Sequence, residues 1–237
     1  MSSLAAAYPD YNVSWSAYDH NHVCFDEEYG IEFLPWVGVS PRLVSVNSLR
    51  PMYTVDLASS SITPGLGPWR MTDAIQSLEN PQAWPSKTEL IGNIKDLGVE
   101  VTVKVVIRLA KPLTEAKARG LASNPEVFLF APRGDDVNPI SWDLSTVSHS
   151  CAGRRGFDFC QEAQSAVASF QKWVSLLHPS DNSALGIFGL SLSELQEQAA
   201  DVRIHGIIVQ DSPEVILRIL KEPSVASASI VDMETYK

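Results

Sequence analysis

The segment that most constrains the fold of this chain is Val99–Leu109, which reads VEVTVKVVIRL. Every odd-numbered residue in it is apolar, and four of the even-numbered ones are polar: Glu100, Thr102, Lys104 and Arg108. Alternation with a period of two is typical of a β-strand with one buried and one solvated face. We therefore expect this strand to lie in an antiparallel or mixed sheet, because a parallel sheet is covered on both faces.

Helical patterns and further strands surround this strand. Ser86 followed by Glu89 is a capping box, and Ser191 followed by Glu194 has the same form. Ser212 followed by Pro213 is a typical start of a third helix. Apolar residues at helical spacing predict helices over 87–97, 161–177, 192–201 and 213–221, and strands are expected near 126–131, 203–210 and 225–233.

The order strand, helix, proline-containing break and strand occurs twice, once within 103–132 and once within 203–232. Two βαβ units predict an α+β protein with a ferredoxin-like (split βαβ) sheet, antiparallel or mixed, and with its helices on one face. Residues 1–70 are rich in Pro, Ser, Trp and Tyr, and alternation at 53–57 indicates a strand there. We expect a β-rich N-terminal segment over 1–70 and the α+β domain over 71–237.

The 237 residues include 18 Lys+Arg and 28 Asp+Glu, a formal net charge of −10. An acidic chain is a poor partner for a phosphate backbone, so we expect no nucleic-acid binding. No apolar run approaches the roughly 20 residues of a membrane span, and the first residues lack the pattern of a signal peptide. The chain is therefore expected to be cytosolic or a piece of a longer protein.

The densest cluster of metal-liganding residue types is the segment 18–30. On a strand, His20, His22 and Cys24 would share one face, and a transition metal could use that arrangement. The alternative is an exposed polar hairpin, since no fourth ligand is identified.

Cys151 and Cys160 are separated by eight residues, a spacing that fits neither a redox CxxC pair nor a zinc knuckle. They could close a small disulfide loop or remain free thiols, and His149 with Cys151 could form a catalytic pair. However, the sequence contains no G-x-S-x-G, H-E-x-x-H, Walker or G-x-G-x-x-G motif. We therefore expect no enzymatic activity and no cofactor. His205 is expected to be half-buried in a strand, and Trp173 is expected to lie in the core.

Several segments resemble the sigma-factor-regulator C-terminal family. The C-terminal segment 202–234 reads VRIHGIIVQDSPEVILRILKEPSVASASIVDME, and 99–121 reads VEVTVKVVIRLAKPLTEAKARGL, like the opening strand and the KPLT turn of that domain. EVFLFAP at 126–132 and the helices at 161–177 and 191–202 follow in the order of the family. Upstream, residues 31–57 resemble the segment after the transmembrane helix in those proteins. The Cys151–Cys160 loop has no counterpart in this pattern.

The resemblance implies the extracytoplasmic sensor domain of a single-pass bacterial anti-sigma factor, whose sigma factor binds a cytoplasmic segment absent from this chain. It implies an envelope signal or ligand of unknown identity and no catalysis. An oxidising compartment favours a Cys151–Cys160 disulfide. Two other readings remain open: a secreted carbohydrate- or peptide-binding module, and a Cys/His hydrolase.

Overall fold

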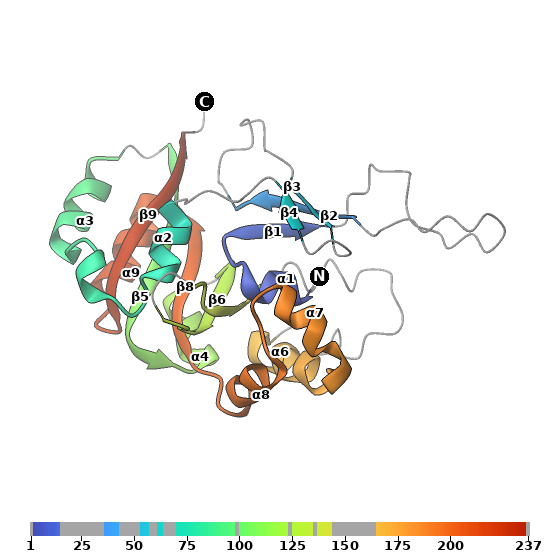
Figure 1. The fold of residues 1–237 in the computed structure, drawn as a ribbon. Coiled ribbons are helices and arrows are strands. Elements are labelled where there is room, and N and C mark those ends of the chain that lie inside the picture. The colour runs from blue at the N-terminus through green and yellow to red at the C-terminus, as the bar shows by residue number, and fades with distance from the viewer. Residues whose placement is uncertain are drawn as a thin grey trace.

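The computed structural model describes residues 2–14, 36–42, 53–56, 61–63, 70–97, 100–122, 125–134, 137–143 and 165–235. Its main sheet contains β5 (Val101–Leu113), β6 (Val127–Ala131), β7 (Ile140–Trp142), β8 (Ile204–Asp211) and β9 (Val225–Thr235). The strand order is β7-β6-β8-β5-β9, and every neighbouring pair is antiparallel (Figure 1). The α+β class and the single sheet that holds all four expected strands are therefore confirmed.

The N-terminal part is β-rich, as its sequence predicts. A short helix, α1 (Ser2–Ala7), precedes β1 (Tyr11–Ser14), β2 (Trp36–Pro41), β3 (Tyr53–Asp56) and β4 (Ser61–Thr63). These four strands form a second antiparallel sheet in the order β1-β2-β3-β4. Ala6 and Ala7 at the end of α1 are buried in the main core, beside β7.

One face of the main sheet is covered by helices that the sequence predicts. They are α3 (Lys87–Lys95), α4 (Glu115–Leu121), α6 (Ala166–Ser175), α8 (Leu192–Ala200) and α9 (Pro213–Lys221). The short 3-10 turn η1 (Pro81–Ala83) precedes α3, and the 3-10 turn η3 (Pro179–Asp181) and helix α7 (Asn182–Ile187) lie between α6 and α8 in the chain. The Ser86 and Ser191 side chains accept the amides of Glu89 and Glu194, so these two caps are confirmed. Helix α6 begins at Ala166 after an extended Ser165, five residues later than expected.

The opposite face of the sheet is also buried, and the expectation of helices on one face is wrong. Helix α2 (Arg70–Gln76) lies beside β9 in Figure 1. Its Met71 and Ile75 form a second apolar core with Val106 and Ile208 of the sheet. The alternation in β5 therefore does not mark a wet face. Thr102 and Lys104 are only 6% and 2% exposed.

Candidate functional site: a buried polar cluster

The residues that the sequence singles out for chemistry lie outside the described residues: His20, His22, Cys24, His149, Cys151 and Cys160. The metal site, the disulfide and the Cys–His pair therefore stay predictions. Among the residues that the structure does describe, no group of three His, Cys, Asp or Glu side chains is placed to hold a metal ion. His205 is half-buried in β8, as expected, and burial lowers its pKa.

A cluster that the sequence did not reveal lies where the N-terminal segment meets the main sheet. At its centre is Arg42, which follows β2 and is only 3% exposed. Its Nη2 is 2.6 Å from Oδ2 of Asp143, directly after β7, and its Nε donates to the carbonyl of Pro9 at 3.0 Å. The pair joins residues 101 positions apart, so it ties the N-terminal segment to the sheet.

A second ion pair continues the cluster along the sheet. Lys104 Nζ lies 3.0 Å from Oε2 of Glu126, and the same oxygen is 3.7 Å from Nη1 of Arg42. Burial lowers the pKa of Lys104, and the Glu126 carboxylate opposes that shift. A charge in the protein interior is tolerated only when it is paired, so the Glu126 carboxylate accounts for the buried lysine in β5.

Asp10 completes the cluster from the other side. Its carboxyl is 5% exposed, and Oδ2 accepts a hydrogen bond from the Thr72 hydroxyl of α2 at 2.5 Å. Asn138, before β7, lies 3.5 Å from Oδ1 through Nδ2, and the same nitrogen donates to the carbonyl of Ala7. Burial raises the pKa of Asp10 to about 6, against the Thr72 hydrogen bond and the Arg42 charge, which lower it.

The buried polar cluster of Asp10, Arg42, Lys104, Glu126 and Asp143 can therefore do two things. It fastens three separate segments of chain together by hydrogen-bonded charges, and it holds one carboxyl that titrates near neutrality. Perturbed buried groups of this kind mark functional sites, although structural ion-pair networks perturb pKa values too. None of these residues carried a sequence signal for burial, and the alternation in β5 places Lys104 on the face expected to be solvated.

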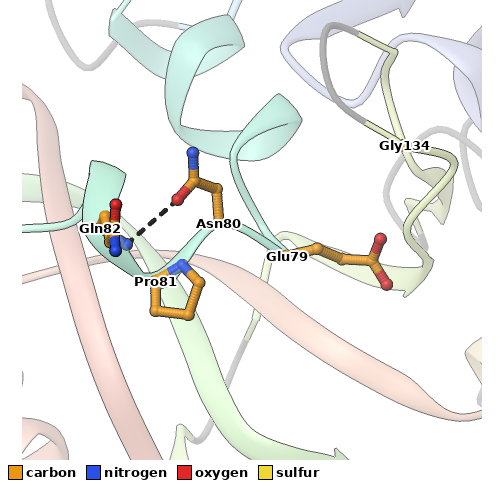
Figure 2. A pocket seen from close by; sticks show the side chains of 5 residues that line it. All are labelled: Glu79, Asn80, Pro81, Gln82 and Gly134. Atoms are coloured by element: carbon orange, nitrogen blue, oxygen red, sulfur yellow. Dashed lines mark hydrogen bonds between the residues drawn. The ribbon is translucent and has the colours of Figure 1, made fainter.

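A separate open pocket of about 610 Å³ lies beside the turn that follows α2. It is lined by Glu79, Asn80, Pro81, Gln82 and Gly134, the last of these in the loop after β6. Figure 2 shows the Glu79 side chain extending towards Gly134, whereas Asn80 accepts the amide of Gln82 at 3.1 Å and so is used within its own turn. The pocket has the size of small-ligand sites, and Glu79, Asn80 and Gln82 supply polar groups to its lining.

Comparison with known proteins gives no match: no family model, no curated protein and no solved structure corresponds to this chain. Among the described helices, none is long and apolar enough to cross a membrane.

Proposed function

We propose that this chain is the extracytoplasmic regulatory domain of a single-pass transmembrane anti-sigma factor, and that it acts without catalysing a reaction. The observation that carries the proposal is the placement of the segments that resemble the sigma-factor-regulator family. They fall in order on β5, α4, β6, α6, α8, β8, α9 and β9, which are the strands and helices of one folded unit. In the full-length protein, a cytoplasmic segment would bind the sigma factor.

We further propose that the core of this unit is a ferredoxin-like split βαβ sheet. β5 and β6 are both antiparallel to β8, so they run parallel with β8 between them, and α4 connects them in the chain. β8 and β9 are likewise parallel, on either side of β5, with α9 as their connection. These two interleaved βαβ units support the assignment, with β7 and α6 to α8 as additions to it.

The buried polar cluster gives the proposed regulator a place where two states could differ. In the family that the chain resembles, the part nearest the N-terminus lies closest to the membrane. Arg42 and Asp10 belong to that part here, and Asp143 and Glu126 belong to the sheet side. A signal can shift the equilibrium between two states only by binding one of them more tightly. A ligand or partner that favours one arrangement of this cluster would meet that requirement.

The test is a transcriptional reporter for the regulon of the partner sigma factor, read in cells that carry the full-length gene. Removing residues 70–235 should change reporter output, and Trp173→Ala, which destabilises the core, should change it in the same direction. The neighbouring Lys172→Ala should behave as wild type, because Lys172 is outside the buried core. Sigma-factor binding by the cytoplasmic segment should survive each change. Unaltered output under every envelope stress would contradict the proposal.

A secreted carbohydrate- or peptide-binding module is the second candidate, and the pocket at Glu79 favours it. The Glu79 carboxylate and the Gln82 side-chain amide in its lining can form hydrogen bonds with the hydroxyl groups of a carbohydrate ligand. Screening glycans and peptides by thermal shift would test this candidate. A hit should disappear in Glu79→Ala and persist in Glu89→Ala, which changes an exposed carboxylate on α3. Turnover of a substrate that is lost in both Cys151→Ser and His149→Ala would favour the hydrolase instead.

A further inference from the structure

Asp10 occupies the point where the N-terminal segment meets two other elements. Its carboxyl lies between Thr72 of α2 and Asn138 before β7. Its backbone carbonyl accepts the amide of Arg42 at 2.9 Å. Gln76 of α2 donates to the same Asn138 side chain at 3.0 Å, so α2, the segment before β7 and residues 7–10 form one continuous hydrogen-bonded set.

The groups that face the Asp10 carboxyl are mostly neutral. Helix α2 presents a hydroxyl and an amide, and the segment before β7 presents an amide. On its own segment lies the Tyr8 phenol, whose pKa is raised first by burial and then by the Asp10 charge. The cation that acts on Asp10 among the described residues is Arg42, whose guanidinium is already held by Asp143 at 2.6 Å.

We propose that Asp10 is a pH-responsive latch, which holds α1 and residues 8–10 against α2 and β7 when protonated and loosens them when ionised. Protonated, the carboxyl adds a neutral donor and acceptor to a hydrogen-bonded set. When ionised, the carboxylate is a buried charge whose cation, Arg42, is already paired with Asp143. Moving the segment into water removes the free-energy cost of burying that charge. The pKa of about 6 places this transition in a range that cells encounter.

The sign and size of the effect follow from linkage. The docked carboxyl has its pKa raised from 3.8 to about 6, and in the released segment it returns to its ordinary value. Docking is therefore strongest below the released value and weakens as pH rises through the docked value. Between pH 5 and pH 7 the ratio of released to docked segment should rise roughly tenfold.

The reporter of release is the Asn138 side-chain amide, because its hydrogen bond to the Ala7 carbonyl at 3.1 Å crosses from the segment before β7 to the docked segment. Residue-resolved hydrogen exchange by NMR, corrected for the intrinsic pH dependence of exchange, should show the tenfold increase in opening in the wild-type chain. Asp10→Asn should show less than a twofold change. Asp73→Asn, which alters the exposed carboxylate next to Thr72, should keep the wild-type response.

A flat profile for the wild type, or an unchanged response in Asp10→Asn, would overturn the latch. Should Asp10→Asn fail to fold, Thr72→Val decides the question. It removes the hydrogen bond that lowers the pKa of Asp10, so the pKa of the docked carboxyl should rise. The pH at which release levels off should therefore move above pH 6. An unmoved transition contradicts the proposal. The measurement uses the chain alone, so its failure would leave the reporter test of the anti-sigma role unaffected.

Discussion

At the scale of single residues, aromatic packing is concentrated between β7 and α6. The Trp142 and Trp173 rings have centroids 5.3 Å apart, and Phe170 contacts Trp142 edge-on at 5.4 Å. The Trp142 indole also donates to the Ser169 hydroxyl at 2.6 Å, which satisfies its buried N–H. These contacts fix α6 against the short edge strand β7. They therefore also hold the end of β7, which Asp143 directly follows.

Trp173→Ala should lower the free energy of unfolding by about 3–5 kcal/mol, the range for deleting a buried aromatic side chain. Trp173 is 6% exposed, as its place on the apolar stripe of its helix predicts. Denaturant melts measure the change, with Lys172→Ala as the control that should stay within about 0.5 kcal/mol. A loss below about 1 kcal/mol would mean that this ring contributes no more than a surface side chain.

Asp143→Ala should cost about 3–5 kcal/mol, because it leaves the buried Arg42 guanidinium without its closest counter-charge. The double substitution of Arg42→Met with Asp143→Leu should be less destabilising than the single change, since no buried charge is left unpaired. Urea melts of the wild type, the single variant and the double variant provide the measurement. Equal losses in the single and double variants would show that the pair stabilises this region in its own right.

At the scale of elements, helix α6 is capped by a residue from another helix. Glu115, the first residue of α4, accepts the amides of Ala166 and Val167, each at 2.9 Å, and the hydroxyl of Ser165 at 2.8 Å. Ser165 in turn accepts the amide of Ala168, so the first free amides of α6 are all satisfied. The carboxylate also pairs with Arg119 one turn along α4, at 2.8 Å.

Glu115→Ala should destabilise the protein by about 1.5–3 kcal/mol, the size for hydrogen bonds to a charged group. Burial acts to raise the pKa of Glu115, but the hydrogen bonds from Val167, Ala166 and Ser165 outweigh it, and the pKa is lowered. Because the pKa of Glu115 is lowered in the folded protein, the stabilisation is present above the ordinary pKa of 4.5. It is lost as pH falls through the lower pKa of the folded state.

Melts at a series of pH values below 5 would measure this loss. Glu115→Gln keeps the size and one acceptor oxygen of the side chain but cannot ionise. Its stability should therefore change less over that interval than that of the wild type. If the two curves run parallel through the acid range, the carboxylate of Glu115 does not carry the effect.

At the scale of the whole molecule, the main sheet lies between two unlike layers. One layer is the predicted set of amphipathic helices, and its core is the larger of the two. The other is α2 with the Trp84 turn, continued by the buried polar cluster towards β7. The second layer depends on charged contacts between distant segments, and charge pairs respond to pH and ligands more than apolar contacts do. We therefore propose this side of the sheet as the place where the proposed regulation acts.

Cys151 and Cys160 should form a disulfide in protein purified without reductant, with Cys24 unpaired. The proposed extracytoplasmic location is oxidising, and a loop of about ten residues should add roughly 2–3 kcal/mol of stability if it closes without strain. Counting free thiols in denaturant measures the pairing. One titratable thiol is the expected result, and three in unreduced protein would contradict it.

The sequence alone determined the elements whose patterns are local. β5, β8 and β9 follow from alternation or apolar runs, and α3, α8 and α9 follow from a cap residue and a helical stripe. Period and capping depend on neighbours within about four residues, so no tertiary contact is needed to recognise them. Residue types also correctly indicated that Trp173 is buried and that His205 is half-buried.

The tertiary structure decided which surfaces are covered and which charges meet. Lys104 lies at a position that alternation marks as solvated, but in the folded chain it is buried and paired with Glu126. Arg42 and Asp143 are 101 residues apart, and Thr72 and Asp10 are 62 apart. No period or motif relates residues at such separations, because their contact is set by how whole elements pack. The candidate site exists for that reason only in the folded chain.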